Sequence, residues 1–272
     1  MLTRTLPAIL LLVIVSLNAG IARAQDDDHD AHHHHAHIHF SHPLIAESPS
    51  PDTKIRFDYF YQRFDDDGVE AADHTARLEF EYAFRPSFSI EVNAPYTVHR
   101  ENFPGENRQH TGNAEVALKF ANFHFEEKGL LLGYGAEFGL PTGSDRKGIG
   151  SSHVFEVTPY VDMGYQRDRL QVVAFTSLSI PANQHKGEDE PKALGYNLSF
   201  LYQLPHHLEP LIELDGESAL SGGEGTAFNI TPGFKFRPLK KRDFSIGLGT
   251  SFPLTHRKEF QNRIIVSAFY HF

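Results

Sequence analysis

Hydrophobic and polar residues alternate along most of this chain from Ile55 onward. The clearest example covers residues 75–84. Its apolar phase comprises Ala76, Leu78, Phe80, Tyr82 and Phe84, and its polar phase comprises Thr75, Arg77, Glu79 and Glu81. A strand places alternate side chains on opposite faces, whereas a helix would scatter the same residues around its circumference. The pattern therefore predicts β-strands with one apolar and one polar face.

About twelve such segments follow one another, and most are close to the 9–11 residues that a tilted strand needs to cross a membrane. They cover 54–64, 73–84, 87–96, 112–124, 129–140, 153–165, 168–180, 193–203, 208–217, 226–236, 243–252 and 261–272. Tight connections alternate with longer polar ones, as in barrels with short periplasmic turns and longer external loops. The sequence therefore predicts an all-β fold: a transmembrane antiparallel up-and-down β-barrel of about 12 strands, with no plug domain.

The last predicted strand closes on an aromatic residue, Phe272. One of its phases is apolar throughout, whereas Ile265 and Phe269 are apolar exceptions on the polar phase. A terminal strand of this kind is typical of outer-membrane barrels, in which the final Phe is part of the signal read by the barrel-assembly machinery. The alternative is a soluble sandwich whose last strand happens to end at the C-terminus.

Alternation alone cannot distinguish a soluble barrel from a membrane barrel, so the charged residues decide between them. They share one phase, and the interior of a roughly twelve-stranded barrel is wide enough to hold them with water. The opposite, aromatic and aliphatic phase would be a poor surface for a soluble protein. The candidate channel-lining residues are Arg56, Asp58, Arg77, Glu79, Glu81, Glu91, Glu115, Lys119, Glu137, Glu156, Asp162, Glu213, Asp215, Lys235 and Arg263. Acidic groups outnumber basic ones in this set, which predicts a preference for cations. The alternative is an internal salt-bridge network that conducts nothing.

The N-terminus carries the marks of an export signal. Arg4 precedes a short apolar run, and Ala22-Arg23-Ala24 forms a small-x-small cleavage pattern. We therefore predict a cleaved signal peptide over 1–24, a disordered His/Asp-rich periplasmic tail and linker over 25–54, and the outer-membrane barrel over 55–272. The tail composition cannot bury a core of its own.

Composition narrows the classes of function. The chain contains no cysteine, which excludes a disulfide framework and thiol catalysis. Its formal charge of -10 argues against nucleic acid as a partner. Outer-membrane lipid and small solutes remain the expected partners.

Three motifs carry a family resemblance. They are GLPTG at 139–143, VTPYV at 157–161 and LSIP at 178–181. Together they resemble the outer-membrane transporters grouped under the name "MetA pathway of phenol degradation", over roughly residues 79–272. The resemblance implies a barrel and the uptake of hydrophobic or aromatic compounds. The histidine-rich tail departs from that family's pattern.

The tail is the most specific chemical signal in the sequence. Its histidines are His29, His32, His33, His34, His35, His37, His39 and His42, and aspartates lie beside them. Neutral imidazole suits Zn, Ni and Cu, and carboxylates add charge and further partners. We predict several weak, interchangeable metal sites and no required cofactor. The alternatives are an expression tag and a solvated tail without a selected ligand.

An outer-membrane hydrolase is the enzymatic alternative. Ser151, Ser152, His153 and Glu156 cluster where a loop meets a strand. Nucleophilic catalysis needs such groups within mutual hydrogen-bond reach, and no GxSxG motif frames either serine. The sequence thus favours a non-enzymatic channel for passive passage of small solutes. A metal-handling outer-membrane protein that captures or buffers Zn, Ni or Cu with its tail is the main alternative.

Overall fold

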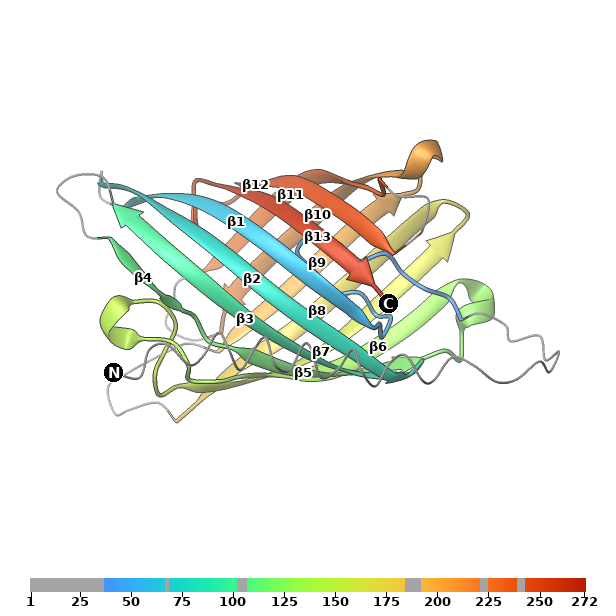
Figure 1. Cartoon of the computed structure of the whole chain (residues 1–272), viewed down its shortest axis with the longest axis horizontal. Helices are drawn as coiled ribbons and strands as arrows, with labels where there is room; N and C mark the ends of the chain where they lie inside the picture. Colours follow the sequence, from blue (N-terminus) through green and yellow to red (C-terminus); the bar gives the residue numbers. More distant parts are fainter. Residues whose placement is uncertain (1–36, 67–68, 102–106, 184–191, 221–224, 239–242) are drawn as a thin grey trace. The chain divides into compact units, whose positions relative to one another are not determined.

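The computed structural model describes residues 37–66, 69–101, 107–183, 192–220, 225–238 and 243–272 (Figure 1). The chain divides into two units, 1–36 and 37–272, and only the second contains described residues. The predicted signal peptide and the tail histidines 29–35 therefore lie outside the described residues. Within the described ranges, no helix is long and apolar enough to cross a membrane.

Strands dominate the described residues, with only three short 3₁₀ turns between them. The strands are β1 Lys54–Asp66, β2 Val69–Arg85, β3 Phe88–Glu101, β4 Arg108–Thr111, β5 Glu115–Asn122, β6 Leu130–Gly139, β7 Phe155–Arg167, β8 Leu170–Ala182, β9 Ala193–Tyr202, β10 Leu208–Ala219, β11 Thr226–Phe236, β12 Phe244–Pro253 and β13 Asn262–His271. The turns are η1 Glu126–Lys128, η2 Asp145–Lys147 and η3 Pro205–His207.

The strands close into an antiparallel barrel (Figure 1). Sequential strands pair as neighbours, and β1 closes the ring by pairing with β13, with Lys54 opposite His271. Both β4 and β5 pair with β3, so they form one interrupted barrel strand. The thirteen strand elements of the described residues therefore make a twelve-stranded barrel, which confirms the predicted fold class.

Most predicted strand boundaries lie within a few residues of the observed ones, and β11 coincides with the predicted range. The largest difference is in the β2–β3 hairpin, which extends well past its predicted ends toward the longer loops. The long connection after β3 also regains pairing as β4 before the break at 112–114. At that break the Gly112 backbone N–H donates to the Pro95 carbonyl at 3.0 Å, a bond that holds the interrupted strand to β3.

The barrel is apolar outside and polar inside. Outward-facing residues such as Leu248, Ile212 and Val161 are about 41–55% exposed. Inward-facing charged residues such as Arg56, Glu79 and Lys119 are almost completely buried. A soluble barrel would show the opposite arrangement, because an apolar outer wall has a favourable environment only in lipid.

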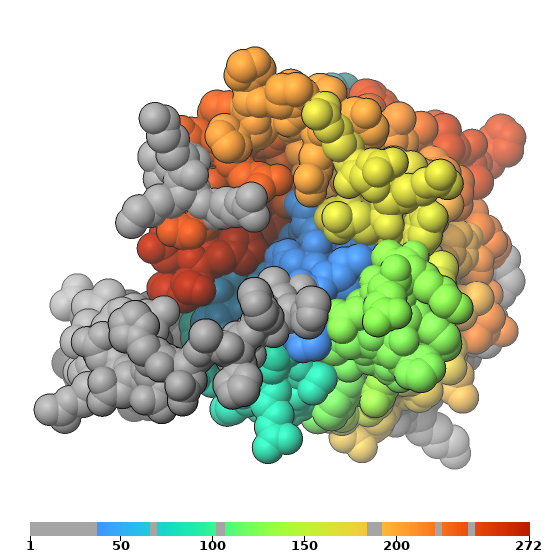
Figure 2. All heavy atoms as spheres, turned by 90° about the vertical axis from the view of Figure 1, so that its right-hand side faces the viewer, coloured from blue at the N-terminus to red at the C-terminus, as the bar shows by residue number. Residues whose placement is uncertain are grey.

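The N-terminal residues 38–52 run inside the barrel. Figure 2 shows these residues, in blue, at the centre of the ring of strands. Phe40 and Leu44 are fully buried, and they pack against inward-facing apolar residues near the short-turn end of the barrel. That apolar collar comprises Ala121, Leu131, Val173, Leu201, Leu211, Ile265 and Phe269. We call residues 38–52 the lumen segment.

This placement corrects the prediction of a disordered tail and linker over 25–54. Residues 37–53 follow a defined path through the barrel, and residues 25–36 lie outside the described residues. Residues 37–53 contain too few apolar residues to form a core of their own. The barrel wall supplies the apolar and hydrogen-bonding partners that a free tail would lack. The described residues contain no independently folded plug domain; the lumen segment has no helix or strand of its own.

A glycine in the wall makes room for the lumen segment. A β-carbon at Gly164 would lie 2.7 Å from the ring of Phe40. We expect Gly164→Ala to cost about 1–3 kcal/mol through overpacking, measured as the free energy of unfolding in lipid vesicles. The added substitution Phe40→Leu should recover much of that loss. An equal loss with and without Phe40→Leu would contradict this packing.

Candidate functional site: an occupied lumen and an acidic vestibule

One buried carboxylate fixes the backbone of the lumen segment. Glu213 on β10 accepts hydrogen bonds from the backbone N–H groups of Leu44, Ile45 and Ala46, at 2.6–3.2 Å. The Ser199 hydroxyl donates to the same carboxylate at 3.0 Å. Charge-assisted hydrogen bonds are stronger than neutral ones, so this contact holds the segment at its innermost turn.

Two basic side chains bind the carbonyls of the same stretch. Lys235 donates to the His42 carbonyl oxygen at 2.6 Å, and the Arg56 guanidinium donates to the Leu44 carbonyl. Gln171 accepts from the Ser41 backbone N–H at 2.9 Å. Buried backbone groups must find partners. The inner wall supplies these partners with side chains, because the segment forms no ladder with any strand.

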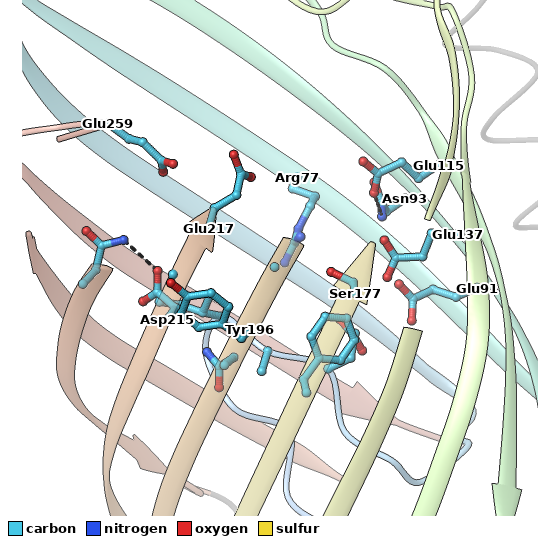
Figure 3. Close-up of a pocket in the computed structure, with 18 residues that line it drawn as sticks. Arg77, Glu91, Asn93, Glu115, Glu137, Ser177, Tyr196, Asp215, Glu217 and Glu259 are labelled. Carbon is cyan, nitrogen blue, oxygen red and sulfur yellow. Dashed lines mark hydrogen bonds between the residues drawn. The ribbon is translucent and has the colours of Figure 1, made fainter. Parts of the chain in front are cut away.

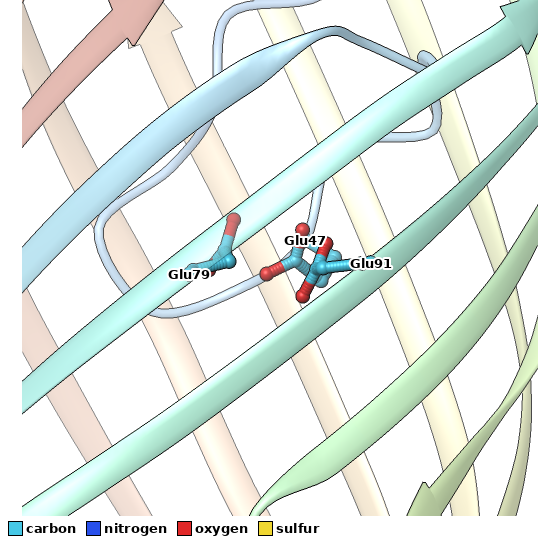
Figure 4. Close-up of side chains that lie close together, drawn as sticks. All are labelled: Glu47, Glu79 and Glu91. Atoms are coloured by element: carbon cyan, nitrogen blue, oxygen red, sulfur yellow. The ribbon is translucent and has the colours of Figure 1, made fainter. Parts of the chain in front are cut away.

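Glu47 lies near the innermost turn, close to Glu79 and Glu91 (Figure 4), and joins an ionic network. Its carboxylate is 3.3 Å from Lys119, 3.6 Å from Arg56 and 3.9 Å from Lys54. Lys54 in turn pairs with Glu79 at 2.8 Å and with Glu81 at 2.6 Å. Carboxylates and basic groups therefore alternate here, and removal of one partner would leave an uncompensated buried charge.

A cavity of about 290 Å³ lies beyond the innermost turn of the lumen segment (Figure 3). Ile45, Ala46 and Glu47 line it from the segment, and strand residues line the rest. Its acidic residues are Glu47, Glu91, Glu115, Glu137, Asp215, Glu217 and Glu259, and its one basic residue is Arg77. We call this cavity the acidic vestibule. Excess negative charge in a confined, low-dielectric space raises the local concentration of cations.

The structure places the predicted channel-lining residues on the inner side of the wall, in two groups. The first group surrounds the lumen segment and is buried: Arg56, Asp58, Glu79, Glu81, Glu91, Lys119, Asp162, Glu213 and Lys235. The second group lines the acidic vestibule and includes Arg77, Glu115, Glu137 and Asp215, and Glu91 belongs to both groups. Glu156 accepts from Thr158 at 3.0 Å, and Arg263 lies over the Phe260 ring at 4.2 Å. These last two belong to neither group.

Sequence reasoning missed the residues that hold the lumen segment through apolar contact. Ile265 and Phe269 are completely buried on the inner face of β13. They are the exceptions to alternation in the last strand, and that departure was the available signal. An apolar residue on an otherwise polar inner face indicates that something apolar lies against it.

The described tail histidines separate into two places. His37 contacts Glu126 of η1 at 2.9 Å. His39 and His42 both contact Asp52, and His271 of β13 joins the same carboxylate. Neither Asp52 nor His271 was among the predicted ligands, because only the fold brings the last strand beside the lumen segment.

Three of the proposed hydrolase residues, Ser151, Ser152 and His153, contact Asp145 of the same loop. The Ser151 and Ser152 hydroxyls both donate to Asp145, and these bonds hold the pKa of that carboxyl below its usual range. His153 contacts Ser151 and Asp145 through the same ring nitrogen, Nδ1, at 3.3 and 3.2 Å. A catalytic triad requires the base to use one nitrogen for the nucleophile and the other for the acid. This geometry does not favour the hydrolase alternative.

The fold has the architecture of outer-membrane β-barrels. Similar solved structures include a KdgM porin, with a TM-score of 0.53 and 13% identity over 80% of this chain and 99% of that one. An outer-membrane channel from Pseudomonas putida has a TM-score of 0.63 and 12% identity, over 82% of this chain and 96% of that one. A NanC porin has a TM-score of 0.56 and 9% identity, over 81% and 100%.

No protein-family profile and no curated protein sequence matches the chain. The similarity to channels and porins therefore concerns the barrel architecture. The phenol-degradation resemblance is not established by these matches.

Proposed function

We propose that this chain is an outer-membrane channel for passive passage of small solutes, with a preference for cations, and that the lumen segment restricts its passage. The observation that carries the proposal is the acidic vestibule. Lysines of the ionic network balance Glu47 and Glu91, and five further acidic residues share the cavity with a single arginine. Rings of carboxylates are a recurring selectivity element of cation channels. The shared barrel architecture with porins and channels supports the same class of function.

The polar lining of the vestibule favours passage of small cationic or polar solutes over passage of hydrophobic or aromatic ones. The residues that line it are mostly charged or amide side chains, and Phe175 and Tyr196 are its aromatic members. The barrel would lie in the outer membrane with its short turns and the tail that begins at residue 25 on the periplasmic side. Insertion by the barrel-assembly machinery through β13 and Phe272 belongs to the same proposal.

Neutralisation of the vestibule tests this selectivity. In planar bilayers under a KCl gradient, we expect reversal potentials that indicate cation preference. Glu115→Gln with Asp215→Asn should shift the reversal potential toward zero, because two acidic groups of the vestibule lose their charge. The measurement uses the chain from residue 25 and, in parallel, a barrel that lacks residues 38–50.

Glu127→Gln is the matched control, since Glu127 is exposed on η1 at the short-turn end. It should leave the reversal potential unchanged. Anion preference, or equal shifts from the control and the double variant, would contradict the role of the vestibule. Absence of conductance in both chains would overturn the channel proposal itself.

A further inference from the structure

Three histidines and one aspartate meet at the short-turn end of the barrel. His39 and His42 lie on the part of the lumen segment that enters the barrel, and Asp52 lies on the part that leaves it. His271 is the last residue of β13, and its strand partner Lys54 follows Asp52 by two positions. The four side chains thus connect both ends of the lumen segment to the final strand.

The three imidazoles converge on one oxygen atom. Oδ2 of Asp52 lies 2.8 Å from His39 Nε2, 3.0 Å from His42 Nε2 and 3.3 Å from His271 Nδ1. The ring centroids of the three histidines lie 5.8–6.5 Å apart. A solvated histidine tail would not be expected to gather three ring nitrogens around a single carboxylate oxygen.

We propose that His39, His42, His271 and Asp52 form a binding site for one divalent transition-metal ion of the Zn²⁺ class, which ties the lumen segment to β13. Imidazole nitrogen and carboxylate oxygen are ligands that Zn²⁺ binds in tetrahedral sites. This inference stands independently of whether the barrel conducts.

Metal binding needs the group to contract. Zn–N bonds are about 2.0–2.1 Å long, so an ion at the place of Asp52 Oδ2 would require each nitrogen to approach by roughly 1 Å. The centroids of imidazoles on one tetrahedral ion lie roughly 5 Å apart, which again calls for a contraction of about 1 Å. Asp52 would rotate to supply the fourth ligand.

The surroundings of His42 and His39 agree with this role. His42 is buried, and its Nδ1 has no hydrogen-bond partner among the described residues. The proton of the neutral His42 ring can therefore reside on Nδ1, which leaves Nε2 available as a metal ligand. The His39 side chain is about half exposed, which leaves the site open to ions from the short-turn end.

A tighter carboxylate group elsewhere is a weaker candidate. Glu47, Glu79 and Glu91 offer oxygens within 4.8 Å of one another. Lys54 lies within 3.9 Å of all three carboxylates and already balances much of their charge. A cation there would have to displace a lysine, whereas the ring nitrogens of the histidine group face the Asp52 carboxylate.

Cobalt titration tests the site without any transport measurement. The chain from residue 25 is used in detergent with His29, His32, His33, His34 and His35 changed to Asn, so that the tail cannot mask the site. We expect one equivalent of Co²⁺ to bind with the visible absorption bands of a four-coordinate ion, and Zn²⁺ to displace it. His271→Gln and, separately, His39→Gln should each weaken binding by at least about tenfold, since each removes a ligand.

His256→Gln is the matched control, because His256 is exposed in the β12–β13 loop at the other end of the barrel. It should bind Co²⁺ like the parent, and circular dichroism confirms folding of every variant. The proposal is overturned if the parent binds no equivalent of Co²⁺. It is equally overturned if folded His271→Gln binds as tightly as His256→Gln.

Discussion

A barrel that lacks residues 38–50 is expected to have a single-channel conductance at least about tenfold higher than that of the chain from residue 25. The interior of a twelve-stranded barrel is too wide for the side chains of its own wall to fill, whereas the interior of an eight-stranded barrel is filled by them. In the described structure the lumen segment occupies the centre of the ring, and Glu213 holds its innermost turn (Figure 2). The deletion removes Phe40, Leu44 and Glu47 together. The measurement is mean single-channel conductance in planar bilayers at one fixed KCl concentration.

A second variant separates the contacts of the lumen segment from its bulk. Replacement of residues 38–50 by a Gly/Ser sequence of equal length keeps the chain but removes the anchoring side chains. We expect frequent openings with noise from a loosely held segment, since the backbone bonds to Glu213 remain possible but the packing of Phe40 and Leu44 and the ion pairs of Glu47 are lost. Conductance equal to the unmodified chain in both variants would show that the segment does not restrict passage.

Leu248→Arg is expected to destabilise the barrel by about 2–4 kcal/mol, the cost of an arginine on the lipid face near the membrane midplane. Leu248 lies midway along β12 and points outward, about 41% exposed. Its strand partners Phe234 and Val266 are also outward-facing. The measurement is the free energy of unfolding by guanidinium in lipid vesicles.

Leu254→Arg is the matched control for position along the membrane normal. Leu254 follows the end of β12 and is about 56% exposed. A charge near the interface costs only about 0–1 kcal/mol. If the two substitutions had equal and small effects, the outer wall would not be facing lipid, and the inside-out arrangement would need another explanation.

Much of the barrel can be predicted from the sequence because its signal is local. Alternation over residues 75–84 corresponds to the C-terminal part of β2, and the terminal strand pattern corresponds to β13. Pro253 is the last residue of β12, where its lack of an N–H costs no ladder bond. The strand period is a property of the backbone and needs no knowledge of distant residues.

The candidate site could be predicted only in part. The inward position of Glu115 and Glu137 follows from their phase in the alternation. The contact of Glu213 with Leu44 joins residues 169 positions apart, and no local pattern encodes it. The loop residues Ser151 and His153 lie near each other as predicted, but the role of Asp145 as their common partner emerged only in three dimensions.

The sequence by itself determined the strand period, the alternation of short and long connections and the separation of apolar and charged faces, because each depends on neighbours along the chain. Only the tertiary structure decided that residues 38–52 enter the barrel and that Asp52 meets His271. A polar segment has no core of its own, so its path depends on partners that the closed wall gathers from many strands. Those partners exist as a set only after β1 has paired with β13.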